Sequence, residues 1–300
     1  LVSVIDERFH LASQTENCAK LSGLDRVDAL YIYYFLSSSG GQQEIKEATV
    51  GAVQAKLPLY NIEKLSVAWP ERKVRETIVS NLGSIDDKIE LNRQINETLE
   101  AMAQALFKSW FVDFDPVIDN ALAAGNPIPD VFAERAKQRA AAKKPENQST
   151  STTAVNDSSN YQHLFPAEFE FTEEMGWIPL GWESIKLIDI LDVKYGKDHK
   201  NLEEGEIPVY GSGGLMRHVN KSLRTGESIL IPRKGTLSNL MFVDEEFWTV
   251  DTMFFSIPKE DHVAKYLFHC LKMLDLSSMN VGSAVPSMTT KVLNDLDLTK

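Results

Sequence analysis

Residues 70–115 read PERKVRETIVSNLGSIDDKIELNRQINETLEAMAQALFKSWFVDFD and are the most regularly patterned stretch of the chain. Side chains recur there in alternating steps of three and four residues, which is the spacing of a coiled-coil seam. The seam consists of Ile78, Leu82, Ile85, Ile89, Asn92, Asn96, Leu99, Ala103, Leu106 and Trp110. Pro70 suits a first helical turn and Pro116 cannot continue a helix. The sequence therefore predicts a helix of about forty residues, roughly 60 Å long.

Two features of this stretch refine the prediction. Gly83 and Ser84 are its weak point, because Ser84 and Asp87 resemble a capping box, which predicts a break or kink there. A buried Asn in a seam costs stability but fixes register and partner, as in a spacer or a dimerising rod. The alternative is an ordinary amphipathic helix that carries its asparagines at the edge of the apolar face.

The C-terminal end of the stretch is unusually rich in aromatic side chains. Such a cluster is either part of a core, which is the commoner arrangement, or a docking surface, because Trp and Phe anchor interfaces. The candidate partner-binding residues are Leu106, Trp110, Phe111 and Phe114.

The composition limits the class of protein. A length of 300 residues with 43% hydrophobic side chains suffices for one or two domains with real cores. The net charge of -12 argues against non-specific binding of nucleic acid or acidic membrane by the chain as a whole, but not against a local basic face. Cys18 and Cys270 lack metal-ligand spacing and indicate a reducing, cytoplasmic compartment. No signal peptide and no bilayer-length apolar run is present, so no membrane partner is expected.

The character of the sequence changes along the chain. A helix is expected at 26–38, and a strand at Leu65–Trp69 ends the first part. A short basic helix at 133–144 precedes the polar, Ser/Thr/Asn-rich stretch 145–160, which is typical of a flexible linker. Strand-like runs broken by Gly and Pro follow, and then a helix at 262–275. The expected parts are 1–69, 70–115, 116–160 and 161–300.

The first and last parts resemble each other, with a period of roughly 230 residues. The parallel segments are 5–12 with 243–250, Tyr33–Leu36 with Tyr266–Phe268, and 50–67 with 281–298. We interpret 1–69 as the second half of a domain and 161–300 as nearly all of a second copy, so that a second long helix is expected beyond Lys300. Two such helices could pair antiparallel with a domain at each end, which suits a split DNA site.

Catalytic signatures are missing from the sequence. It contains no GxxxxGK[ST] phosphate loop, no HExxH and no zinc pattern of paired cysteines. The Gly-rich run 211–214 lacks the spacing and helix context of a nucleotide fingerprint, and the six His are scattered. The chain therefore reads as non-catalytic.

Residues 194–239 form a locally basic window in an acidic chain, with eight Lys and Arg against five Asp and Glu. Such side chains neutralise phosphates or read guanine edges, and small hydroxyl and amide groups reach bases or phosphates. The alternative is a set of solvated loop charges with turn glycines. The DNA-binding candidates are Lys197, Lys200, Arg217, Lys221, Arg233, Lys234, Thr236, Ser238 and Asn239, then Ser287, Thr289 and Thr290 in a second loop, and Gln54 and Lys56 in its counterpart in the first copy.

Three stretches carry a family resemblance. LGSIDDKIELNRQINETLEAMAQALFKSWFVDFDPV at 82–117 resembles the central conserved helix of the specificity subunits of type I restriction–modification systems. LFPAEFEF and MGWIPLGWE at 164–183 resemble the lead-in to the second target-recognition domain of that family. The run from Val209 to Phe255 resembles the body of the same domain.

The resemblance implies an α+β fold, with mixed α/β target-recognition domains joined by a long coiled-coil-forming helix. Each domain would read one half of a bipartite double-stranded DNA site. The helices would set the spacing and dock two methyltransferase subunits, and restriction subunits would join that core. S-adenosylmethionine, ATP and magnesium would belong to those partners, so that this chain binds no cofactor. By this resemblance, we expect the first half of domain one and the second conserved helix to lie outside this sequence.

Three hypotheses follow. The first is a DNA-recognition subunit that has no catalytic activity alone. The second is a coiled-coil scaffold whose globular domains bind protein, and the third is an enzyme with an unrecognised site. Salt dependence separates the first two, because affinity based on phosphate contacts falls steeply with salt.

Overall fold

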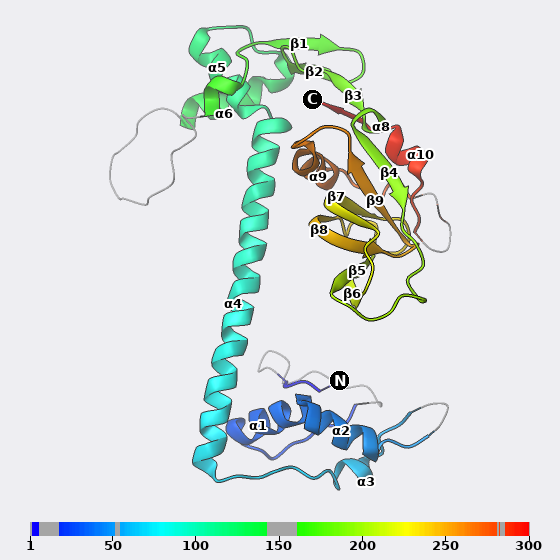
Figure 1. Ribbon diagram of the computed structural model, residues 1–300. Coiled ribbons are helices and arrows are strands. Elements are labelled where there is room, and N and C mark those ends of the chain that lie inside the picture. Colours follow the sequence, from blue (N-terminus) through cyan, green and yellow to red (C-terminus); the bar gives the residue numbers. More distant parts are fainter. Residues whose placement is uncertain are drawn as a thin grey trace. The chain divides into compact units, whose positions relative to one another are not determined.

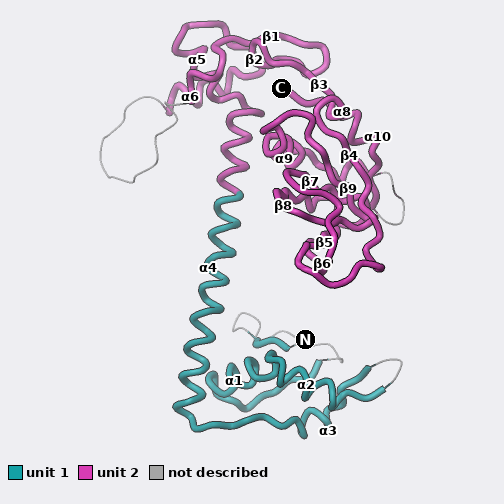
Figure 2. Tube along the Cα trace, viewed as in Figure 1, with its two compact units in different colours: residues 1–100 teal, residues 101–300 magenta. Residues whose placement is uncertain are grey.

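The computed structural model describes residues 2–5, 18–51, 55–142, 161–280, 282 and 286–299 (Figure 1). The chain forms two compact units, one of residues 1–100 and one of residues 101–300 (Figure 2). Helices and strands both build the fold, which confirms the predicted α+β class.

The first unit is helical in its described part. It contains α1 (Arg26–Ser37), α2 (Ser39–Ala48) and α3 (Leu59–Ile62). The Asp25 carboxylate caps α1 by accepting from the Asp28 amide, and the Ser38 hydroxyl caps α2 by accepting from the Gly41 amide. The predicted helix at 26–38 is confirmed, whereas α2 was not predicted.

The long helix α4 runs from Arg72 to Phe111, 40 residues, and begins within the first unit. Arg75, only 8% exposed, donates from Nε to Asp28 at 3.0 Å and lies with its guanidinium 4.1 Å from the centre of the Trp69 ring. The Tyr34 hydroxyl donates to Asp86 at 2.7 Å. These contacts anchor the first turns of α4 on α1.

The predicted break at Gly83 and Ser84 does not occur, because α4 is continuous through both residues. The Ser84 hydroxyl donates to the Ser80 carbonyl at 2.8 Å and so does not cap a new helix. Such back-bonding is how Ser is accommodated in a helix interior.

The middle of α4 is exposed to solvent. Every residue from 84 to 99 is exposed. The exposed apolar side chains of the seam and its margin are Leu82, Ile85, Ile89, Leu91, Ile95, Leu99, Met102 and Leu106. Pairing of this stripe with another helix stays a prediction.

The second unit opens with the last turns of α4 and two short helices. Phe114 adopts a left-handed conformation with φ 53°, which turns the chain into α5 (Asp115–Ala124). The short helix η2 (Asp130–Phe132) leads into α6 (Ala133–Ala142). Val117, Ile118 and Ala121 are fully buried. Residues 116–142 of the part expected at 116–160 are therefore folded, because α5 carries an apolar face that packs, and the short basic helix expected at 133–144 is found as α6. Residues 143–160, which include the stretch expected as a linker, lie outside the described part.

A six-stranded sheet is the body of the second unit, with strand order β4-β9-β7-β8-β5-β6. Two small antiparallel pairs, β1 with β2 and β3 with β10, flank it, and a short helix α8 lies between β3 and β4. The bounds are β1 (Phe169–Thr172), β2 (Gly176–Pro179), β3 (Ser184–Lys186), α8 (Leu187–Ile190), β4 (Leu191–Tyr195), β5 (Ile207–Gly211), β6 (Gly214–Val219), β7 (Arg224–Pro232), β8 (Met241–Thr249), β9 (Met253–Pro258) and β10 (Asp297–Thr299). A further short helix, η3 (Gln162–Leu164), precedes β1.

Both faces of the central strands are buried. Side chains alternate across a strand, so Ile229 and Ile231 of β7 join one apolar cluster while Leu230 joins the other. The first cluster also receives α9 (Val263–Met273) and α10 (Thr290–Asn294), through Leu271 and Leu293. Burial on two sides explains why these strands read as continuous apolar runs.

The structure supports part of the internal repeat and corrects part of it. The alignment of 50–67 with 281–298 superposes α3 on α10. The Tyr31 hydroxyl donates to the Ala68 carbonyl, and the Tyr266 hydroxyl donates to the Thr299 carbonyl, which is the equivalent position. The helices therefore correspond through Tyr31 and Tyr266, not through Tyr33.

Of two further sequence expectations, one is wrong and the other stays largely untested. Leu65–Trp69 is not a strand, although its counterpart β10 is; β10 pairs with β3, and no strand of the described first unit pairs with this segment. Most of the repeat segment 5–12 lies outside the described residues.

Candidate nucleic-acid interface

The loop after β7, residues 233–239, is the centre of the candidate site. The amides of Arg233 and Lys234 both donate to the Thr252 carbonyl, at 2.9 and 3.2 Å. The Arg233 carbonyl accepts from the Met288 amide at 2.9 Å. The loop is thus held between the start of β9 and the segment before α10.

A second set of contacts ties this loop to the β5–β6 turn. Gly235 has φ +91°, and a Cβ there would lie 3.2 Å from the Ser212 hydroxyl, so the close approach needs glycine. The Asn239 side-chain amide donates to the Ser212 carbonyl at 2.8 Å. Leu237 is 3% exposed and anchors the loop in the core, while Thr236 and Ser238 on either side stay exposed.

The structure brings the two predicted loops together. Lys234 and Ser287 form an isolated β-bridge, and the Gly235 amide donates to the Pro286 carbonyl at 3.1 Å. Thr289 caps α10 by accepting from the Val292 amide, and Thr290 is the first residue of that helix. Residues from both loops therefore contribute to one surface.

Arg233 is held at this surface by two contacts. Its guanidinium lies 5.3 Å from the centre of the Tyr195 ring, and its Nη1 donates to the Asp251 carbonyl at 2.9 Å. No carboxylate forms an ion pair with Arg233 or Lys234 among the described residues.

The remaining basic candidates differ in what they do. Lys197, Lys200 and Lys221 are exposed. Arg217 is half-buried, and its Nη2 donates to the carbonyls of His199, at 3.1 Å, and Leu202, at 2.6 Å. Arg217 therefore braces the loop before β5.

In the first unit, Lys56 is exposed and forms an isolated β-bridge with Val50, at the position equivalent to Ser287. Gln54 lies outside the described residues.

The predicted docking aromatics pack inside the second unit. Phe114 is 7% exposed, and the half-buried Trp110 and Phe111 contact other rings. Trp110 meets Phe165 edge-on at 5.6 Å, and Phe111 meets Tyr266 edge-on at 5.3 Å. Within the chain these aromatics form a core, and of the four partner-binding candidates Leu106 alone is exposed.

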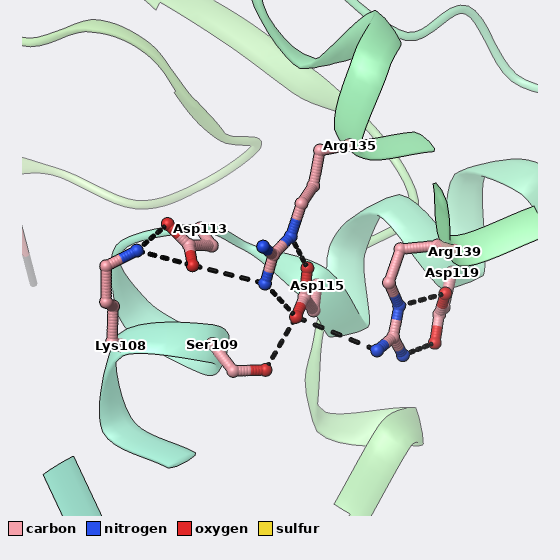
Figure 3. Close-up of polar contacts among 7 residues, drawn as sticks. All are labelled: Lys108, Ser109, Asp113, Asp115, Asp119, Arg135 and Arg139. Carbon is pink, nitrogen blue, oxygen red and sulfur yellow. Dashed lines mark hydrogen bonds and ion pairs between the residues drawn. The ribbon is translucent and has the colours of Figure 1, made fainter. Parts of the chain in front are cut away.

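A cluster of ion-paired side chains joins the C-terminal end of α4 to α5 and α6 (Figure 3). Arg135 of α6 donates to both carboxylate oxygens of Asp115, at 2.7 and 2.8 Å. Arg139 binds Asp119 in the same two-point manner and approaches Asp115 at 3.7 Å. The Ser109 hydroxyl also donates to Asp115, at 2.7 Å. We call these residues the α6 arginine cluster.

The environment of Asp115 sets its charge state. Burial alone would raise the pKa of this carboxyl. Hydrogen bonds from Arg135 and Ser109, with the positive charges of Arg139 and Arg135, outweigh burial and lower the pKa below its ordinary value. Asp115 is therefore ionised and structurally committed.

Sequence reasoning did not find Tyr195, Asp251 or Ser212, which shape the candidate interface. Tyr195 ends β4 and is exposed. Its exposure is what marks it as a candidate, and exposure cannot be read from the sequence. Among the described residues, no group of three or more His, Cys, Asp or Glu is arranged to hold a metal ion. None of the described helices is both long and apolar enough to cross a membrane.

A long helix joined to an α+β unit, with a braced cationic loop free of carboxylates, defines a protein suited to bind anions or nucleic acid. The chain belongs to the family described as the type I restriction modification DNA specificity domain, which matches residues 2–101 and 179–299.

Individual relatives are similar over shorter stretches. The chain is 37% identical over 147 residues to the type I restriction enzyme HindI specificity subunit of Haemophilus influenzae, a match that covers 46% of this chain and 32% of that protein. It is 30% identical over 92 residues to the MjaIX specificity subunit of Methanocaldococcus jannaschii, covering 31% of this chain and 21% of that protein. The matches thus span no more than about a third of these relatives.

Two solved structures are also similar. One is the S subunit of a type I restriction–modification system from M. genitalium, with a TM-score of 0.42 and 16% identity, covering 92% of this chain and 63% of that chain. The other is the HsdS subunit from Thermoanaerobacter tengcongensis, with a TM-score of 0.35 and 13% identity, covering 90% of this chain and 57% of that chain.

Proposed function

We propose that this chain is a sequence-specific DNA-recognition subunit of a type I restriction–modification complex. The observation that carries the proposal is the loop 233–239, in a chain of this family. It presents Arg233 and Lys234, which form no ion pair with a carboxylate in the described part of the chain, and it is tied to two neighbouring segments. Rigid loops of this kind suit base reading, because base contacts need fixed geometry.

Electrostatics favour a local site over general attraction. The whole chain carries a net charge of -12, so its overall field repels DNA. Binding must then come from unneutralised cations close to the duplex, and Lys197, Lys200 and Lys221 add exposed charges to those of the loop. Thr236, Ser238 and Asn239 supply hydroxyl and amide groups at the same loop.

The two units would act as related readers of a bipartite site. In this proposal the first unit uses the Lys56 loop as the second unit uses the Ser287 loop. We further propose that the exposed stripe of α4 pairs with another long helix, because solvent-exposed leucines and isoleucines at seam spacing gain about 25 cal/mol per Å² when covered. The paired helices would set the distance between the half-sites.

Catalysis would belong to partners. We propose that methyltransferase and restriction subunits bind S-adenosylmethionine, ATP and magnesium, that this chain performs no chemical step, and that the complex works in the cytoplasm, where the DNA is. Leu106 is the exposed member of the predicted docking residues, and we propose that it contacts a partner directly.

The decisive experiment compares the methylation pattern of host DNA with and without the intact gene. A bipartite methylated motif that disappears with the gene supports the proposal. An unchanged pattern refutes it.

Binding measurements with the assembled complex separate DNA recognition from the scaffold hypothesis. DNA affinity that falls steeply between low and moderate salt supports phosphate contacts. Salt-insensitive or absent DNA binding, with intact protein assembly, would favour the scaffold.

The docking assignment has its own test. Leu106→Asp should weaken co-purification of the methyltransferase subunit without unfolding the chain, because Leu106 is 51% exposed. Trp110→Ala with Phe114→Ala should also weaken it, but through loss of the aromatic core, which thermal unfolding would reveal. If Leu106→Asp leaves co-purification unchanged, Leu106 is not a docking residue.

A further inference from the structure

Tyr195 and Arg233 reach each other across one strand. Tyr195 ends β4 and Arg233 follows β7, and β9 lies between these strands. The first residues of β9 meet both neighbours: Phe254 is opposite Tyr195, and Met253 is opposite Pro232. The exposed Tyr195 ring contacts Phe254 edge-on at 5.0 Å, so the core fixes its position.

The guanidinium of Arg233 is held in one orientation, but most of its hydrogen-bond donors have no acceptor among the described residues. An Arg side chain has five N–H donors. One of them serves the Asp251 carbonyl, and the described residues offer no acceptor to the other four. By contrast, the buried or half-buried Arg75, Arg135 and Arg139 all bind carboxylates.

Stacking explains how such a group is kept in place. A guanidinium over an aromatic face is held by cation–π attraction, and a rotamer-rich side chain fixed in advance loses less entropy on binding. Tyr195 is 52% exposed, so part of its ring packs on Phe254 while the rest stays open to the guanidinium.

We infer that Tyr195 is a positioning residue that aims the Arg233 fork at the major-groove edge of one guanine in the target. Guanine N7 and O6 match the fork of Arg, whereas Lys presents a single point charge. This inference rests on the proposed function and names one of its specificity-determining pairs.

The test uses the complex assembled with its own modification subunits and maps methylated sites in bacterial DNA. Tyr195→Leu removes the aromatic face, Tyr195→Phe keeps it, and Arg233→Lys keeps the charge but loses the fork. Phe171→Leu is the matched control, because Phe171 is also an exposed aromatic on a strand but lies on β1, away from the loop.

We expect Arg233→Lys and Tyr195→Leu to relax discrimination at the same base pair by about tenfold or more. Tyr195→Phe should keep discrimination, and the control should methylate the original motif. Replacing the guanine at that position with 7-deazaguanine in a binding duplex should weaken the wild-type complex and leave Arg233→Ala unaffected, because the N7 acceptor is lost and the alanine variant has no donor for it.

Two outcomes would overturn the inference, and a third would refute the function on which it rests. Uniform weakening across all sequences would make Arg233 a phosphate contact. Intact discrimination in a folded Tyr195→Leu would remove the role of Tyr195, and if that variant fails to fold, intact discrimination in Arg233→Lys has the same force. Absence of any motif in the wild type would instead refute the proposed function itself.

Discussion

Arginines serve opposite purposes in two regions of the second unit. In the α6 arginine cluster, Arg135 and Arg139 each grip a carboxylate through two hydrogen bonds. In the loop after β7, Arg233 rests on an aromatic ring and a carbonyl, and no counter-charge is within ion-pair distance among the described residues. An arginine that is paired with a carboxylate contributes its charge to the stability of the fold, whereas an arginine without such a partner keeps its charge for binding. The partner is therefore more informative than the burial of the side chain.

The same contrast separates stability from recognition. Removing one member of a buried ion pair leaves an uncompensated charge, which is costly to the folded state. Removing an arginine that has no counter-charge costs the fold little and affects only what that arginine would bind. Four measurements would break or sharpen this distinction.

The largest effect is expected at Asp115, which is 3% exposed. Asp115→Ala should lower the free energy of unfolding by about 1–3 kcal/mol, because Arg135, Arg139 and Ser109 lose a shared acceptor, although Asp113 and Asp119 still pair with the two arginines. Urea unfolding measures it. Glu134→Ala is the control: Glu134 is exposed, pairs with exposed Lys137 at 3.7 Å, and should change stability by less than about 0.5 kcal/mol. Equal effects would mean that the cluster is not structural.

The next effect concerns DNA. Arg233→Ala should weaken specific binding by about 1–3 kcal/mol while leaving the free energy of unfolding within about 0.5 kcal/mol. Arg139→Ala should do the reverse, reducing stability and sparing the affinity of the folded protein. Titration of both variants with target and scrambled duplexes decides the matter. If Arg233→Ala unfolds as Arg139→Ala does, the contrast drawn above is wrong.

Lowering the pH should weaken the contribution of the α6 arginine cluster to the stability of the folded chain. The folded-state pKa of Asp115 lies below its ordinary value of 3.8, so its contribution to stability is fully present above about pH 4 and is lost as the pH falls through the folded pKa. The stability difference between the wild type and Asp115→Asn should therefore shrink from pH 5 to pH 2. Unfolding curves across that range test this, and a constant difference would contradict it.

The smallest effect is expected from an exposed lysine of the basic window. Lys221→Ala should reduce the slope of log affinity against log salt by about 1, equally for target and non-target duplexes. Lys137→Ala, an exposed lysine of α6, should leave the slope unchanged. A sequence-dependent loss in Lys221→Ala would instead assign Lys221 to base reading.

The sequence located the elements better than it located their partners. Seam spacing predicted α4, and the cluster of Arg233, Lys234 and Gly235 predicted a loop that the structure finds at the end of β7. The position of Tyr195 was out of reach, because it depends on β9 inserting between two strands that are distant in sequence. Likewise, the local sequence pattern does not predict that Arg135 binds Asp115, which lies twenty residues earlier.

Other differences have similar causes. The aromatic run after Leu106 satisfies the pattern of a docking surface and of a core equally well, and only the placement of Trp182 and Phe165 around it decides for a core. The capping signal at Ser84 was outweighed because its hydroxyl finds the Ser80 carbonyl within a continuous helix.

The exposed middle of α4 has a consequence for hydrogen exchange. All of its residues between 84 and 99 are exposed, so their backbone amides depend on the hydrogen bonds along the helix. Such amides exchange through fraying and brief local opening, well before global unfolding. Deuterium uptake in this segment would therefore act as a built-in gauge of partnership, fast when the stripe is open to water and slow once another helix lies against it.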